Sequence, residues 1–456
     1  MKRAPIYFRR QRNTGNKEEG IIIILVAVFL LFVVGAMAAL SIDVTTFYTA
    51  RSEAQIAADS AALAAARVLA NSGMTSDPNA ASDGLLANAE TLATRIATQV
   101  AQQNRIGGAA ATTVNVSYDP PCNPQAPIQN PCVRVRVVRN DLPAFFARIW
   151  GTTQVQVSAT AVAEAYNPSG LANGTTGSLS SPIATTCVKP WVLPNLDPSN
   201  PGNTIFIPSS GDIQTTTLLG WDSTDPGTGK LLYSIDPGNG PAAWQYYPSN
   251  QTSFPAPAPQ TLSSCAAGLN GVRSDYQQSV AGCVQMPIYC GGNIDTPTGT
   301  SNVQLEANYP TRDQETADAV NCLTHTLPNT LGGDTVLVNP KITSGQPFQF
   351  RGGDNNPIPG AITKNIMVSD SLVTVPVYDD TANGGGPPGA GNKVRIIGFV
   401  QLFVNSDGIG TPDASAATAQ IKTTVVNLIG CGTGALGPPV MGNGPSAVAV
   451  RLVSSR

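Results

Sequence analysis

The chain of 456 residues has little charge and a single histidine. Aspartate, glutamate, lysine and arginine make up 12% of it, against ~25% in typical soluble domains. The formal net charge of −3 does not provide the basic surface that nucleic acids require, so we expect no nucleic-acid partner. With His325 as its one imidazole, the chain cannot build a histidine-rich metal site and has little means for histidine-based catalysis.

Proline is scarce in the N-terminal part, where Pro5 and Pro78 are the two that precede residue 120. The rest of the 37 prolines follow, together with most of the 44 glycines. Their combined share stays below the ~25–30% of disordered low-complexity chains. Since 42% of the residues are apolar, the chain can bury a large core, and disorder throughout is excluded.

Residues 21–42 form an uncharged apolar run behind a basic leader, residues 1–20. As a helix this run is roughly 33 Å long, enough to cross a hydrocarbon core of ~30 Å. We predict a single transmembrane helix at residues 21–42, with the leader in the cytoplasm and everything after Asp43 outside. Ala36–Met37–Ala38 matches the A-x-A pattern of a signal-peptide cleavage site, but the length of the apolar run favours a retained anchor.

All eight cysteines follow Asp43, on the side where an oxidising compartment favours disulfides. Their spacings match no zinc-binding pattern, and no metal site is predicted. We predict two short-range pairs, Cys122–Cys132 and Cys283–Cys290. The alternative for some of the cysteines is a buried free thiol.

Residues 41–72 contain neither proline nor glycine and predict a helix that continues from the membrane segment to Gly73. Alanines at intervals of four form one stripe along it, here called the alanine stripe: Ala50, Ala54, Ala58, Ala62, Ala66 and Ala70. Such small side chains predict close packing, within the chain or with a partner. The alternative is that alanine is frequent because it is the best helix former.

The next part of the sequence predicts a small α+β module at residues 43–166. A second helix is expected at residues 80–104, with its apolar residues on one face. Strands are expected at 112–118, 133–139 and 152–166. The short segment Pro143–Trp150, which precedes the last strand, predicts a short amphipathic helix.

Residues 167–182 have the Gly, Ser, Asn and Thr composition of a flexible linker. Residues 183–456 contain six of the eight cysteines and few helical signals, so we predict a mainly-β, disulfide-stapled domain, a sandwich or barrel. Its strand-like runs are residues 335–339, 366–378, 394–404, 421–429 and 447–453. The fold class expected for the whole chain is α+β.

Two segments carry a family resemblance. Asp43–Ala70 (DVTTFYTARSEAQIAADSAALAAARVLA) and Leu142–Ala165 (LPAFFARIWGTTQVQVSATAVAEA) resemble the N-terminal module of TadG-like proteins of the bacterial Flp-pilus, tight-adherence (Tad) systems. The resemblance implies a pilin-like module and an inner-membrane anchor. It also implies pilins or other pilus components as partners, and it brings no catalytic residue. Thr185–Asn195 and Val426–Gly432 resemble C-terminal parts of some such proteins more weakly.

The sequence departs from two patterns found among proteins of these systems. Gly20 precedes the apolar run, as in pilins that are processed there, but the fifth residue after it is Leu25 and not glutamate. A retained anchor is therefore favoured over processing at Gly20. The run 413–417 lacks the second serine of the D-x-S-x-S metal site of von Willebrand A-like domains, so we do not assign that domain.

No motif for chemistry is complete. His325 has no serine elbow or acidic partner nearby in the sequence and is predicted to be a structural or surface residue. Asp379–Asp380 and residues 354–356 could bind calcium but match no EF-hand loop, so we favour solvated turns. Gly227–Lys230 lacks both the first glycine and the final Ser/Thr of a P-loop. We predict no catalytic residue, no cofactor and no small-molecule substrate.

Three functions follow, in order of preference. The first is a membrane-anchored, non-catalytic structural component of Flp/Tad-type pilus assembly or surface adherence, in the inner membrane with its bulk periplasmic or surface-exposed. The second is an envelope adhesin or binding module presented on a helical stalk. The third is an envelope hydrolase that uses His325.

Overall fold

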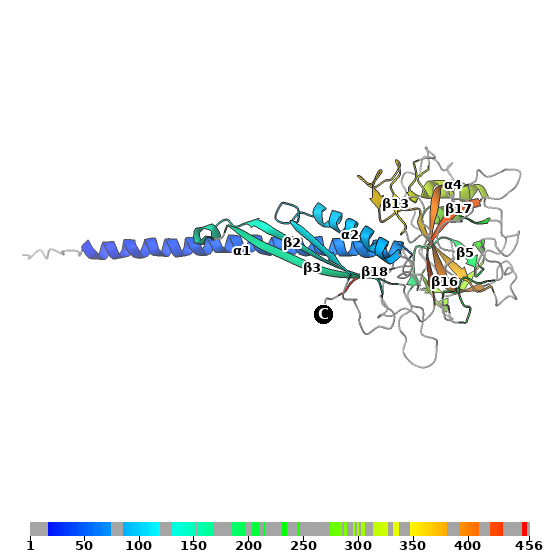
Figure 1. Cartoon of the computed structure of the whole chain (residues 1–456), viewed down its shortest axis with the longest axis horizontal. Coiled ribbons are helices and arrows are strands. Elements are labelled where there is room, and N and C mark those ends of the chain that lie inside the picture. Colours follow the sequence, from blue (N-terminus) through cyan, green and yellow to red (C-terminus); the bar gives the residue numbers. More distant parts are fainter. Residues whose placement is uncertain are drawn as a thin grey trace, which may run out of the picture.

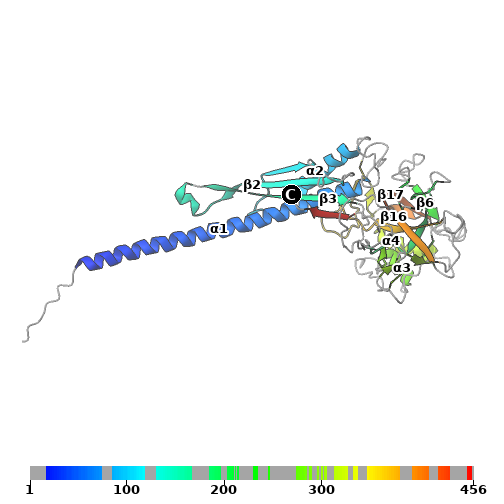
Figure 2. The same ribbon diagram turned by 90° about the horizontal axis from the view of Figure 1, so that it is seen from below.

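The computed structural model is elongated, with a long helix that leads from the N-terminal end to a β-rich head (Figure 1). A smaller module of one helix and four strands lies along the second half of this helix (Figures 1 and 2). The predicted linker, residues 167–182, lies outside the described residues. The structure describes residues 17–73, 85–118, 130–151, 153–166, 184–196, 203–209, 211, 213–214, 230–234, 245–246, 274–284, 287–289, 295–296, 299–300, 302–305, 313–326, 332–336, 347–380, 393–409, 420–431 and 449–453.

Helix α1 (Lys17–Asn71) is a single unbroken helix of 55 residues. Nearly all its side chains from Ile21 to Ile42 are exposed, and most of those from Ala50 onward on one face are buried. Gly73, with a φ of 84°, takes the left-handed conformation that ends helices and that glycine adopts without steric cost. The long apolar N-terminal helix expected from the sequence is confirmed.

The module pairs α1 with helix α2 (Leu85–Gln103) and an antiparallel sheet in the order β1-β2-β3-β18. The apolar alternation of the second strand is why it forms this sheet: Val133, Val135 and Val137 are buried, whereas Arg136 between them is exposed. The strands are β1 (Thr113–Ser117), β2 (Cys132–Pro143), β3 (Gln154–Tyr166) and β18 (Ala449–Val453), and the 3₁₀ helix η1 (Ala147–Trp150) lies between β2 and β3.

The alanine stripe packs inside the module. None of its six residues is more than 1% exposed. Helix α1 contacts α2, β2, β3 and β18, and alanines also occupy the facing positions, among them Ala93 of α2 and Ala161 and Ala163 of β3. Small side chains on both sides let the helix backbone approach the sheet closely. The stripe therefore offers no surface to a partner chain.

The head is built around a seven-stranded sheet in the order β6-β17-β16-β15-β5-β7, with β11 paired to β16. Strand β15 pairs in parallel with β5 and antiparallel with β16, so the sheet is mixed. Its strands are β5 (Trp191–Pro194), β6 (Lys230–Ser234), β7 (Gln245–Tyr246), β11 (Asn302–Gln304), β15 (Leu372–Tyr378), β16 (Lys393–Ile409) and β17 (Gln420–Gly430).

Smaller elements cover this sheet. Helices α3 (Asp275–Ala281) and α4 (Asp313–Leu323) pack against each other. The core includes the stacked rings of Phe350 and Phe403, whose centroids are 5.0 Å apart. The remaining strands are β4 (Ala184–Thr185), β8 (Ile288–Tyr289), β9 (Asp295–Thr296), β10 (Gly299–Thr300), β12 (Thr335–Val336), β13 (Phe350–Arg351) and β14 (Asn365–Ile366).

Amide side chains join the module to the head. Asn427 of β17 donates to the carbonyl oxygen of Ala70 (2.8 Å) and to Oε1 of Gln401 (2.5 Å), and all three groups are buried. Asn71 donates to the carbonyl oxygen of Met367 at 3.1 Å. Because unpaired carbonyls at a helix C-terminus are costly to bury, these bonds favour one fixed position of the head on α1.

The C-terminal strand lies in a different place from the one that the sequence suggested. We expected residues 447–453 to belong to the β-rich domain at 183–456. Strand β18 instead pairs with β3 in the module, from Ala449 opposite Tyr166 to Val453 opposite Val162. An ion pair between Arg451 and the buried Glu164 holds the two strands together. The alternation of a five-residue strand does not reveal which sheet it joins.

One of the two predicted disulfide pairs is wrong. Cys283 bonds with Cys187, with Cα atoms 4.7 Å apart, and therefore not with Cys290. Cys283 follows the end of α3 by two residues, and it lies close to Cys187 because the residues next to each, Val284 and Val188, pair in a β-bridge. Cys132 is disulfide-bonded, but Cys122, its predicted partner, lies outside the described residues. All five described cysteines are in disulfides.

Packing at the alanine stripe can be tested by adding volume. We expect Ala58→Leu to lower the free energy of unfolding by about 1–3 kcal/mol, because the larger side chain cannot fit between α1 and the sheet. Ser52→Leu adds a leucine on the exposed side of the same helix and should leave stability nearly unchanged. Urea unfolding of the full chain in detergent micelles measures both. Equal stabilities would contradict the close packing.

Candidate functional sites

The first half of α1 presents apolar side chains in every direction. Within the described residues it is the helix that is long and apolar enough to cross a membrane. The side chains from Ile21 to Leu31 are all exposed, including Phe29 at 63%. Exposure of this much continuous apolar surface to water would be strongly unfavourable, so this half of the helix requires an apolar environment.

The first acidic residue after this segment, Asp43, is bonded to a distant part of the chain. Its carboxylate accepts backbone N–H groups from Phe145 (3.1 Å), Phe146 (3.0 Å) and Ala147 (2.7 Å). These residues belong to the turn between β2 and β3, residues 143–151, here called the hairpin tip. Asp43 is 1% exposed, so three donors replace the water that its charge would otherwise bind.

A second acidic residue of α1 holds another loop about 15 Å further along the helix. Glu53 accepts the backbone N–H of Gly107 at 2.5 Å. The carbonyl oxygens of Ile106 and Gly107 accept the guanidinium of Arg139 from β2, which also pairs with Asp141 at 2.9 Å. Asp43 and Glu53 thus fix two loops of the module to the part of α1 that follows its apolar half.

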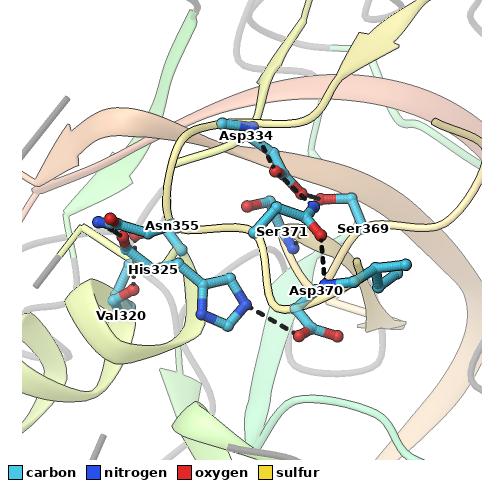
Figure 3. Close-up of polar contacts among 11 residues, drawn as sticks. Val320, His325, Asp334, Asn355, Ser369, Asp370 and Ser371 are labelled. Atoms are coloured by element: carbon cyan, nitrogen blue, oxygen red, sulfur yellow. Dashed lines mark hydrogen bonds and ion pairs between the residues drawn. The ribbon is translucent and has the colours of Figure 1, made fainter. Parts of the chain in front are cut away.

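The head contains a polar cluster centred on Asp334, which is 1% exposed (Figure 3). One carboxylate oxygen accepts the N–H of Gly353 (2.9 Å) and Nδ2 of Asn356 (2.8 Å). The other accepts the hydroxyl of Ser369 at 2.6 Å, and that oxygen accepts the N–H of Ser371. These donors come from the segment after β13 and from the segment before β15, so Asp334 fixes the two segments to one another.

His325 lies next to this cluster, one turn beyond the end of α4 (Figure 3). Its Nε2 is 3.0 Å from Oδ2 of Asp370, and its side chain is buried. Its φ of 57° is left-handed, and its carbonyl oxygen accepts Nδ2 of Asn355 at 2.7 Å. The bonded partner of the ring is a carboxylate and not a hydroxyl or thiol, so the arrangement connects α4 to the loop at 369–371.

Lys189 is a buried lysine of the head, with 4% of its surface exposed. Burial lowers the pKa of Lys189 to about 7, and the negative charge of Asp370 opposes this effect. The ammonium donates to the carbonyl oxygens of Val280 (2.8 Å) and Gly282. These bonds hold the end of α3 beside the Cys187–Cys283 disulfide. The role that this geometry supports is structural.

Three of the residues considered as calcium ligands from the sequence, Asp379, Asn355 and Asn356, have protein partners. Asp379 pairs with Arg395 at 2.6 Å, and burial raises the pKa of the neighbouring Asp380. Asn355 and Asn356 bond with the loops around Asp334. The described residues contain no group of three His, Cys, Asp or Glu side chains placed to hold a metal ion.

Sequence reasoning did not find the roles of Asp43, Asp334 and Lys189. The sequence did contain a signal for Asp43, because it is a single carboxylate directly at the end of an apolar run. If another part of the chain packs on the helix there, such a carboxylate needs hydrogen-bond donors from that part. For Asp334 and Lys189 the partners are backbone and amide groups tens of residues away. Nothing in the local sequence marks such groups.

Comparison with known proteins identifies the N-terminal helix. Residues 20–68 match the family described as "Putative Flp pilus-assembly TadE/G-like". The matched segment is the apolar half of α1 and nearly all of its alanine stripe, and it confirms the resemblance to TadG-like proteins found in the sequence. No match was found among curated proteins or among solved structures.

The Asp43 contact predicts a local loss of order when its carboxylate is removed. In Asp43→Ala the amides of residues 145–147 should exchange with solvent faster, and the free energy of unfolding should fall by about 1–3 kcal/mol. Asp43→Asn keeps one acceptor oxygen and should give an intermediate effect. Hydrogen exchange of the full chain in micelles measures this. Asp59→Ala, which removes an acidic group on the exposed side of α1, is the control.

The buried lysine predicts a pH-dependent stability. The pKa of Lys189 is about 7 in the folded chain and near 10.5 when unfolded, so between these values the unfolded state binds more protons. The stability of the wild type relative to Lys189→Met should therefore rise with pH, by about 2–3 kcal/mol between pH 7 and 9, and should be constant below pH 7.

Urea unfolding followed by tryptophan fluorescence, with the disulfides intact, gives the two curves. Lys189→Met also loses the hydrogen bonds to Val280 and Gly282. This loss lowers the free energy of unfolding by the same amount at every pH, so it does not change the slope. Lys364→Met, at an exposed lysine of the head, should run parallel to the wild type. If Lys189→Met also runs parallel to it, the lysine is not buried as described.

Proposed function

We propose that the chain is a membrane-anchored structural component of a Flp/Tad-type pilus-assembly or surface-adherence machine, and that it does no catalysis. The observation that carries the proposal is the family match at residues 20–68, which falls on the helix with the exposed apolar half. A pilus-related segment and a membrane-crossing segment are thus one continuous helix.

The location that we propose is the bacterial inner membrane, crossed once by residues 21–42. The basic leader would remain in the cytoplasm, and the module and head would lie in the periplasm or at the surface. The disulfides of the five described cysteines support this orientation, because disulfides persist in oxidising compartments. The anchor is proposed to be retained and not processed at Gly20.

The partners that we propose are pilins or other components of the same machine. Because the alanine stripe is buried within the chain, contact with a partner helix would use the exposed residues 21–42 instead. The module resembles a pilin in having one long helix packed on an antiparallel sheet. Asp43 and Glu53, which fix two loops to α1, have a structural role. The contact between the buried His325 and the partly exposed Asp370 is structural as well, and it gives the hydrolase hypothesis no support.

An adhesin is the second candidate. The observation that favours it is that the head has its own seven-stranded sheet and lies at the end of α1 remote from the apolar half (Figure 1). A fragment of residues 183–448, which leaves β18 out because that strand belongs to the module, would then bind a surface polymer after oxidative folding. Failure of this fragment to bind, together with a loss of pili in the deletion strain, favours the first candidate.

The proposal is tested in the cells that produce the protein. Deleting the gene should reduce pili and surface adherence, and the wild-type chain should restore both. Leu30→Arg places a charge in the apolar segment, at a cost of roughly 2.5–3.5 kcal/mol for insertion, and should fail to restore them. Gln55→Arg introduces the same side chain at an exposed position of the module and should restore them. Unchanged piliation and adherence after deletion would contradict the proposal.

A further inference from the structure

The hairpin tip lies beside α1 where the segment that the sequence assigns to the membrane ends (Figures 1 and 2). At 1.5 Å per residue, a hydrocarbon core of ~30 Å that begins at Ile21 ends near Leu40. Ala39 is already covered, at 8% exposure, whereas Leu40 next to it is exposed. One turn further on the same face, Asp43 binds the tip. The tip therefore covers α1 at the level where the hydrocarbon core meets the lipid head groups.

We propose that the hairpin tip, residues 143–151, is a second membrane contact that inserts into the head-group region of the leaflet on the module's side. The occupant of its exposed apolar surface is thus the same bilayer that α1 crosses, because the tip is bonded to α1 at Asp43, directly after the exposed apolar residues of that helix. The inference rests on the membrane anchoring that forms part of the proposed function.

The electrostatics of α1 fit this depth. Between Ile21 and Arg51, Asp43 is the one charged residue in the sequence, and the tip covers its carboxylate. Three threonines follow Asp43 on α1: Thr45, Thr46 and Thr49. Each hydroxyl donates to the carbonyl oxygen four residues earlier in the helix, so these hydroxyls do not depend on water for a hydrogen bond. Tyr48, 72% exposed, is of the type enriched where membrane meets water.

The backbone of the tip is suited to a region with little water. An N–H group without a partner is costly there, and five of those in the tip are bonded. Asp43 accepts three of them, those of Phe145, Phe146 and Ala147. The N–H of Ala144 donates to the carbonyl of Thr153, and that of Gly151 to the carbonyl of Arg148.

Two exposed side chains of the tip, those of Phe145 and Arg148, are of the kind found at membrane interfaces. Phe145 is 60% exposed although it is large and apolar, and its burial in the head-group region would be favourable. Arg148 is exposed on the same short turn and can reach lipid phosphates while its alkyl stem stays in the apolar layer. A loop in bulk water would gain nothing from exposing that phenylalanine.

The depth of the tip can be measured with spin labels. The full chain, with its disulfides formed, is reconstituted in vesicles of phosphatidylethanolamine and phosphatidylglycerol. A nitroxide is attached in turn at Phe145→Cys, at Phe29→Cys in the apolar half of α1, and at Asn115→Cys on an exposed position of β1. Collision with oxygen and with a water-soluble nickel complex then reports the depth of each label. Wild-type protein taken through the same labelling gives the background.

We expect the label at 145 to collide severalfold less often with the nickel complex than the label at 115, and to lie between the labels at 115 and 29 in depth. If 145 is as accessible to nickel as 115 while 29 is protected, the tip stands in water and the inference is overturned. If 29 itself is accessible, membrane anchoring fails, and the proposed function fails with it.

Discussion

The contact between the alanine stripe of α1 and the sheet of the module is the constraint on which the rest of the molecule depends. Alanines on both surfaces allow the helix and β3 to lie close together over the full length from Ala50 to Ala70. This contact fixes the direction of α1 relative to the sheet. It thereby places Asp43 under the hairpin tip and the end of α1 against Asn427 of the head.

The features that the sequence revealed are those set by local periodicity. Each of these patterns lies within a short stretch of sequence, so the elements of the module were predictable. They are the apolar run, the alternation of Val133, Val135 and Val137, and the helical spacing of α2. The buried β16 strand was recognisable for the same reason, because its residues are apolar almost without interruption. Packing of the alanine stripe was foreseen only as one of two possibilities, since small side chains do not specify what covers them.

Features set by contacts between distant segments could not be foreseen. The partner of Cys283 depends on the bridge between Val188 and Val284, and the place of β18 depends on the free edge of β3. The bonds of Asp43, Asp334 and Lys189 go mostly to backbone groups, which every residue carries and which leave no mark in a sequence. For the candidate sites, residue types could therefore be proposed from the sequence, but not the groups that they meet.

The pairing of β18 with β3 has a consequence for how the protein is made. Ala449 lies opposite Tyr166, so nearly all of the head is inserted between two neighbouring strands of one small sheet. Because synthesis proceeds from the N-terminus, the edge of β3 stays open until residues 449–453 have been made. The module is thus completed after the head and not before it. A chain truncated near its end would retain a folded head on a module with an unprotected strand edge, the kind of edge that pairs with other chains.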